Sequence, residues 1–237
     1  MATPLVDLLG KMEAAGASDL FLTEGKPPGA RIHGQLRVIN EPVTSAAALR
    51  ELVDTLVPPL ARRRFEETGD LDVGVTLPNG KRLRLSLLRQ QGALGLVARS
   101  VPPGAIDLAT LGLPEGLAAF VAQPRGLVLV TGATGSGKST TLAALIHQIN
   151  RARAAHIVTI EDPIEFVHHD LLSRVTQREI GSDSVSFQAA LRQVVRQSPD
   201  VILVGEMRDA ETMGVAVSAA LTGHLVLASV HAVDATQ

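Results

Sequence analysis

The feature that most constrains this chain is a glycine-rich segment, Gly132–Ser139, with the sequence GATGSGKS. It follows a short apolar run, Gly126–Thr131, and precedes a helical segment, Ser139–His147. An apolar strand, a glycine-rich turn ending in Lys-Ser and a helix together form the pattern of a phosphate-binding loop. Glycines let successive backbone amides point inward at a polyphosphate, and the helix N-terminus adds partial positive charge. The sequence therefore predicts a phosphate site between a strand and a helix.

Individual residues of this loop have separate expected roles. Lys138 is expected to reach the β- and γ-phosphates, and Ser139 to offer its hydroxyl to Mg²⁺. The remaining residues expected to contact the nucleotide are Gly132, Thr134, Gly135, Ser136, Gly137 and Thr140. ATP and Mg²⁺ are therefore the predicted ligands.

Composition limits the classes of partner. The 237 residues are 46% apolar, which is enough for a sizeable core, and the formal charge is −2. With no tryptophan or tyrosine and five phenylalanines, the chain is poorly equipped to stack bases, so nucleic acid is not an expected partner. Cysteine is absent, which excludes disulfides and thiolate chemistry. No apolar span has membrane length, so we expect no transmembrane segment and a cytoplasmic location.

The N-terminal part mixes helical and strand patterns. We expect helices at 5–15 and 46–56, and a hairpin around Pro78-Asn-Gly80, because Asn-Gly supplies the positive φ of a tight turn. The expected strands are 20–22, 30–38, 71–77, 82–88 and 95–101. Pro102-Pro-Gly104 follows the last strand and is the expected boundary. This predicts a domain at 1–101, a linker with a connecting helix at 102–125, and a core at 126–237.

The core alternates apolar strands with helices. Strands are expected at 126–131, 155–160, 199–205 and 224–231, and runs that are apolar on both faces indicate a parallel sheet buried between helices. Helix 187–196 is expected to be capped by Ser186, and a second helix to run from Asp209 to about Leu221, before Gly223. The sequence therefore predicts an α/β fold for this part.

Polar residues follow three of these strands, where ligands of open parallel sheets bind. They are the cluster Glu161–Glu165, Glu206 and His231. Glu206 follows an apolar strand as in a Walker B motif, but Gly205 stands where the metal-coordinating aspartate is usual. Mg²⁺ is therefore expected to be held by Ser139, phosphates and water, with Glu206 acting through the water shell. The adjacent His168 and His169 are expected to diverge on a solvated loop rather than to bind a metal.

Four segments together resemble a known family: Gly132–Ser139, Ile160–Phe166, Val201–Asp209 and Thr222–Ala232. They look like the Walker A, Asp box, Walker B and His box of secretion ATPases. Within that superfamily the chain resembles the type IV pilus retraction ATPases (PilT and PilU). Gly16–Leu22 and Gly25–Pro28 match the same branch, and Phe21, which stands where many PilT sequences have histidine, leans towards PilU. No cysteine-rich zinc segment of the assembly and secretion ATPases is present.

The resemblance implies a fold and a set of roles. It implies a RecA-like P-loop core, C-terminally truncated, preceded by a smaller PAS-like α+β domain. It implies Glu165 as the catalytic glutamate and Glu206 as the Walker B acid, although both carboxylates remain candidates for the base. The other implied site residues are His224 and His231 of the His box, and Arg84 and Arg99, which would bring positive charge to the γ-phosphate.

The resemblance also implies an assembly and a location. The expected protein is a hexameric motor for pilus retraction in twitching motility, cytoplasmic and peripherally associated with the inner membrane through a pilus platform protein. Because Gln237 falls just after the His-box strand, we expect the sheet to continue in a longer protein.

Other functions fit the loop alone. The alternatives are a secretion or pilus-assembly ATPase of the same superfamily, a small-molecule phosphotransferase, a nucleic-acid motor and an inactive regulatory subunit. A phosphotransferase would need an acceptor pocket and a lid, and no arginine-rich lid follows Lys138.

Overall fold

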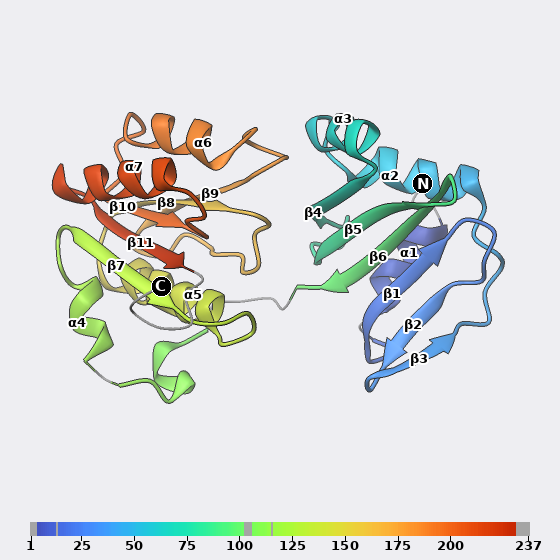
Figure 1. Cartoon of the computed structure of the whole chain (residues 1–237). Coiled ribbons are helices and arrows are strands. Elements are labelled where there is room, and N and C mark those ends of the chain that lie inside the picture. The colour runs from blue at the N-terminus through green and yellow to red at the C-terminus, as the bar shows by residue number, and fades with distance from the viewer. Residues whose placement is uncertain (1–3, 13, 102–105, 115, 231–237) are drawn as a thin grey trace. The chain divides into compact units, whose positions relative to one another are not determined.

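A computed structural model describes residues 4–12, 14–101, 106–114 and 116–230. The chain divides into two compact units, Met1–Pro103 and Gly104–Gln237, called here the N-terminal and C-terminal units (Figure 1). Each unit contains its own sheet, and their buried apolar side chains form separate clusters.

The N-terminal unit is an antiparallel sheet with helices on one face. Its strands are arranged in the order β3-β2-β1-β6-β5-β4. The elements are α1 (Pro4–Lys11), β1 (Ala17–Thr23), β2 (Gly29–Ile32), β3 (Gln35–Val38), α2 (Ala46–Leu56), α3 (Pro59–Thr68), β4 (Asp70–Thr76), β5 (Arg82–Gln90) and β6 (Ala93–Ser100).

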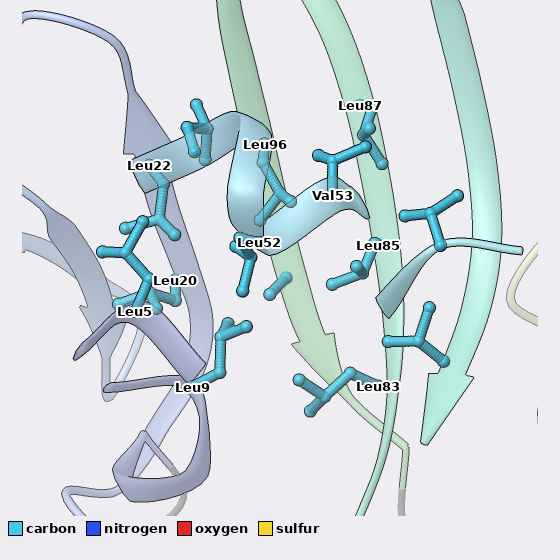
Figure 2. Close-up of a cluster of buried hydrophobic side chains, with 14 of the residues drawn as sticks. Leu5, Leu9, Leu20, Leu22, Leu52, Val53, Leu83, Leu85, Leu87 and Leu96 are labelled. Atoms are coloured by element: carbon cyan, nitrogen blue, oxygen red, sulfur yellow. The ribbon is translucent and has the colours of Figure 1, made fainter. Parts of the chain in front are cut away.

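Alternation along the strands creates the core of this unit. Leu83, Leu85 and Leu87 of β5 are buried, whereas the residues between them are partly exposed. Figure 2 shows these leucines with Leu96 of β6 opposite apolar residues of α1 and α2, among them Leu9. One face of the sheet is therefore apolar and covered by helices, and the other face is free to carry charge.

Two hairpins illustrate how turn chemistry shapes the sheet. The expected hairpin around Asn79-Gly80 is confirmed, because β4 pairs with β5 and Gly80 has a φ of 82°. The strand expected at 30–38 is wrong as a single element. His33 and Gly34 have φ values of 49° and 79°, so the chain turns there and forms two strands.

The C-terminal unit contains a parallel five-stranded sheet in the order β7-β11-β10-β8-β9. Figure 1 shows α6 and α7 on one side of this sheet and α5 on the other. The elements are η1 (Leu108–Leu111), α4 (Leu117–Val121), β7 (Gly126–Thr131), α5 (Lys138–Ala152), β8 (His156–Glu161), β9 (Arg174–Glu179), α6 (Phe187–Val194), β10 (Val201–Val204), α7 (Ala210–Leu221) and β11 (Leu225–Val230).

The sequence pattern predicted most of this unit. The α/β class and the parallel sheet are confirmed, and the side chains of Ser186 and Asp209 cap α6 and α7 as expected. Strand β9 was not predicted, because Arg174–Glu179 reads RVTQRE and lacks an apolar run. The PAS-like character of the N-terminal unit stays a prediction.

Candidate functional site

The glycine-rich loop leaves the carboxyl end of β7 and enters α5. Gly135 and Gly137 have φ values of 78° and 92°, which L side chains rarely adopt. At Gly132 a Cβ would lie only 2.6 Å from the Ser136 Oγ. The loop therefore requires glycine at these positions, and it curls tightly before the first turn of α5. This is the cradle that a phosphate group needs.

Lys138 is the first residue of α5 and is buried at the centre of the loop. Its Nζ donates hydrogen bonds to the carbonyl oxygens of Gly132 and Ala133, both at 2.9 Å. These bonds hold the ammonium group inside the curl of the loop. A phosphate oxygen placed there would be a charged acceptor, which forms a stronger hydrogen bond with an ammonium group than a carbonyl does.

The loop forms one wall of a cleft of about 390 Å³. Thr134, Gly135, Gly137, Ser139 and Thr140 line this cleft with Lys138. Two carboxylates of the sequence prediction, Glu165 and Glu206, line it as well. The carboxyl ends of β7, β8 and β10 thus bring together the phosphate loop and both candidates for the base, as the order of strands in a parallel sheet requires.

Glu206 is held by Arg208, which lies in the expected Walker B segment Val201–Asp209 and was given no role from the sequence. The Arg208 Nε donates to the Glu206 Oε2 at 2.7 Å, and this hydrogen bond raises the pKa of Arg208. The Glu206 side chain is 19% exposed and that of Arg208 is 65% exposed. Arg208 also lines the cleft, so it places a permanent positive charge at the edge where phosphates would lie.

Gly205, at the position of the usual Walker B aspartate, lies in a tightly packed place. Its amide donates to the carbonyl of Ile160 at 2.8 Å, and a Cβ would lie 3.2 Å from that oxygen and 3.3 Å from the Glu161 Cα. The backbones of β10 and β8 approach so closely there that a Cβ would force them apart by a few tenths of an ångström. The tight packing of this sheet therefore favours glycine at the position of the usual aspartate.

Ser139 and Glu206, the residues expected to serve Mg²⁺ directly and through water, both line the cleft. In the described ranges no group of three or more His, Cys, Asp or Glu residues could hold a metal ion. This donor set fits a magnesium ion that keeps most of its ligands as water and phosphate oxygens.

Glu161 and Glu165 lie on either side of the Asp-box bend. Glu165 is exposed at the cleft, whereas burial raises the pKa of Glu161 to about 7. The Glu161 Oε1 accepts hydrogen bonds from Thr159 Oγ1 at 2.6 Å and from Gln177 Nε2 at 3.1 Å. Gln177 belongs to the strand that the sequence analysis missed. The sequence of this strand, RVTQRE, has no apolar run from which a strand could be predicted.

The two adjacent histidines differ from the prediction. His169 is exposed as expected, but His168 is buried and lines the cleft. Burial lowers the pKa of His168 to about 4, and its Nδ1 has no hydrogen-bond partner within the described residues. The solvated-loop prediction is therefore wrong for His168, because the loop folds back over α5 instead of projecting into solvent.

The structure does not bring the first His-box residue to the loop of the same chain. His224 precedes β11, whose first residue Leu225 pairs with Gly126 at the start of β7, so His224 lies at the amino edge of the sheet. Its Nδ1 is 2.9 Å from the carbonyl oxygen of Ala219. His231 lies outside the described residues.

Arg84 and Arg99 belong to the N-terminal unit and are direct cross-strand neighbours on β5 and β6. Arg99 Nε donates to Asp19 Oδ1 at 2.8 Å, and Arg84 lies 3.0 Å from Asp72. Asp19 also pairs with Arg31 at 3.5 Å. Register places Arg31, Asp19, Arg99 and Arg84 in one line across four strands, which we call the charged row.

Within the described part of the chain, no helix is long and apolar enough to cross a membrane. The protein-family comparison matches residues 7–237 to a family described as type II/IV secretion system protein.

Individual relatives agree with that match. PilT of Pseudomonas aeruginosa, a type IV pilus retraction ATPase, is 42% identical over 98% of this chain and 68% of its own length. The twitching motility protein of Neisseria gonorrhoeae is 44% identical over 89% of this chain and 56% of its own length. A crystal structure of the pilus retraction motor PilT with bound ADP superimposes with a TM-score of 0.88 and 40% identity, over 96% of this chain and 67% of that one. The chain thus spans between about half and two thirds of the length of these proteins.

Proposed function

The chain belongs to the type II/IV secretion system protein family, and we propose that it is an ATP-hydrolysing subunit of a motor that retracts type IV pili. The observation that carries this proposal is the cleft in which the phosphate loop, Glu165 and Glu206 meet at the carboxyl edge of a parallel sheet. Two relatives that share more than 40% identity with the chain are named for pilus retraction and twitching motility.

Nucleotide binding follows from the loop. The β- and γ-phosphates would be surrounded by the N-terminus of α5 and by the backbone amides of Gly135 and Gly137. The positive φ of these two glycines lets their amides turn toward the phosphates. Lys138 would exchange its bonds to loop carbonyls for bonds to phosphate oxygens. Ser139 would hold Mg²⁺, with Glu206 behind a water molecule; the ion would supply charge neutralisation of the phosphates when bound.

Hydrolysis requires a water molecule that is oriented and deprotonated beside the γ-phosphorus. We assign this to Glu165, whose exposed carboxylate at the cleft can accept a proton from water as the oxygen attacks. Glu206 is the less favoured base because Arg208 already engages its Oε2 at 2.7 Å. Arg84 and Arg99 of the N-terminal unit would add positive charge to the γ-phosphate during the reaction.

The same proposal includes an assembly. We propose that the protein works as a homo-oligomer, a hexamer, at the cytoplasmic side of the inner membrane, where it acts on a pilus platform protein. The names of two relatives, which refer to pilus retraction and twitching motility, support this, because pulling on a pilus requires a motor fixed to the membrane machinery.

Phosphate release from ATP, measured without any acceptor molecule, tests the proposal. Lys138→Ala is expected to lose most nucleotide affinity, and Glu165→Gln to bind ATP normally but turn over about 10²-fold more slowly. Glu41→Gln, at an exposed position outside both units' cores, is the matched control and should behave as the unmodified protein. Phosphate transfer that depends on an added acceptor would support the phosphotransferase alternative instead.

A further inference from the structure

The loop that carries Glu165 is tied to an unpredicted strand by side chains. Gln177 of β9 contacts it twice. The Gln177 Nε2 donates to the carbonyl oxygen of Phe166 at 2.8 Å, and the Gln177 Oε1 accepts from the amide of His168 at 2.7 Å. The same Nε2 donates to the Glu161 Oε1 at 3.1 Å. One amide side chain therefore joins the end of β8 to both residues that flank Val167.

A second side chain of β9 holds the other side of the loop. Glu179 lies two residues beyond Gln177, so both point to the same face of the strand. Its carboxylate is buried, and its Oε2 accepts from the amide of Ile164 at 3.1 Å. The contacts of Gln177 and Glu179 thus bracket Glu165 on both sides, at Ile164 and at Phe166.

These contacts matter because the loop has no regular backbone hydrogen bonds of a helix or a strand. Residues 162–168 belong to no helix or strand, so their backbone amides and carbonyls depend on side chains for hydrogen bonds. A displacement of about 1 Å at a catalytic group can lower the rate by about 10²-fold. The Glu165 side chain is exposed, so its position follows that of the backbone that carries it.

We infer that Gln177 is a positioning residue, which holds the backbone of residues 164–168 so that the Glu165 carboxylate faces the cleft. It acts without contacting the nucleotide, and Glu179 assists it from the Ile164 side. The inference rests on the proposed function, because it requires Glu165 to be the base.

The direct test is Gln177→Met in the intact protein, which keeps the size of the side chain and removes all three hydrogen bonds. We expect kcat to fall about 10-fold or more while the Kd for a fluorescent ATP analogue stays within about twofold. Gln177→Glu provides a second, isosteric variant that keeps the bond accepted from His168, loses the two donated bonds and places a second carboxyl group beside Glu161. It should lower kcat in the same direction if the methionine variant folds poorly.

The matched control is Thr176→Val on the same strand. Thr176 points to the opposite face of β9, where its Oγ1 is 3.0 Å from the His156 Nε2, so this change removes a hydrogen bond from the strand without touching the loop. We expect its kcat to be unchanged. If the Gln177 variants and Thr176→Val have equal kcat values while Glu165→Gln is still slow, the role of Gln177 is overturned and the proposed function stands.

A double variant separates positioning from general stabilisation. If Gln177 acts through Glu165, adding Gln177→Met to Glu165→Gln should slow turnover by less than about twofold further. Independent, multiplicative losses would overturn the inference. Full activity of Glu165→Gln would instead overturn the proposed base, and failure of the unmodified protein to bind or hydrolyse ATP would overturn the proposed function.

Discussion

Gly205 shows how a single residue can depart from a motif for a reason of packing. Its missing Cβ makes room for the backbone of Ile160 and Glu161, which belongs to the neighbouring strand and cannot rotate away as a side chain could. A residue with a side chain at this position must push β10 and β8 apart at the edge where Glu206 and Glu161 lie.

We therefore predict that Gly205→Ala lowers the free energy of unfolding by about 1–3 kcal/mol, as overpacking does. Gly205→Asp should lower it at least as much and should not increase the affinity for Mg²⁺. Urea unfolding followed by circular dichroism measures the first effect. Gly214→Ala, on a helix where a Cβ meets nothing within 4 Å, is the control. Equal stability of Gly205→Ala and the unmodified protein would contradict the packing argument.

Two titratable groups of the C-terminal unit, His168 and Glu161, make the free energy of unfolding depend on pH in opposite directions. The pKa of His168 is lowered by burial to about 4, so between about pH 4 and 6.5 the folded chain binds fewer protons there than the unfolded chain, and stability is lost as the pH falls. The pKa of Glu161 is raised by burial to about 7, so its contribution is present below about pH 4.5 and is lost as the pH rises to 7. The two slopes oppose each other in the shared window.

Single substitutions should expose each slope. Relative to the unmodified protein, His168→Gln should gain stability as the pH falls from 6.5 to 4.5, because it removes the group that resists protonation. Glu161→Gln should gain stability as the pH rises from 4.5 to 7. Urea unfolding at three pH values checks both. Parallel pH profiles for the variants and the unmodified protein would show that these groups titrate normally in the folded state.

At the scale of elements, predictability follows the strength of the apolar pattern. Helix α2 and strand β7 have the predicted bounds because each carries an uninterrupted periodic pattern with a clear start. Strand β9 was not predicted because its sequence is polar. It forms a strand by pairing with β8, and the spacing of residues along the chain does not reveal that contact. The contacts made by Gln177 and the burial of His168 were not predicted for the same reason, because both depend on how residues 162–168 fold back onto the sheet.

The charged row of the N-terminal sheet also leads to a prediction. Asp19 is 4% exposed and lies between Arg31 and Arg99, whereas the pair of Asp72 and Arg84 is more open, at 44% and 38% exposed. Asp19→Asn would leave two arginines beside a neutral group in a partly buried place. We expect it to lower the free energy of unfolding by about 1–2 kcal/mol.

The matched control for this change is Asp72→Asn, whose exposed pair should contribute less than about 0.5 kcal/mol. Chemical unfolding at low and high salt measures both, and the loss in Asp19→Asn should persist at high salt because burial limits screening. A loss in Asp72→Asn as large as that in Asp19→Asn would show that burial of the central carboxylate is not what matters.

At the scale of the whole molecule, the two units carry separate buried clusters. Leu85 belongs to the N-terminal cluster and Leu145 to the C-terminal one, and both are fully buried. We predict that Leu85→Ala destabilises the N-terminal unit by about 2–5 kcal/mol and speeds hydrogen exchange across residues 14–101 only.

Leu145→Ala is the reciprocal variant and should speed exchange across residues 116–230 only. Hydrogen exchange followed by mass spectrometry locates both effects in one experiment. Faster exchange in both units from either single substitution would show that the two clusters unfold together rather than separately.

The polar character of β9 has a second consequence, for solubility. Within the described residues this strand ends the five-stranded sheet on one side, and the edge of such a strand can recruit the edge of another molecule. Arg174 at the start of this strand is exposed, and the amides of Val175 and Glu179 donate to the side chains of Asp170 and Asp183 at 2.9 and 2.8 Å. An approaching strand would therefore find these two donors already occupied. The strand that holds the loop of Glu165 thus also has an edge that discourages aggregation.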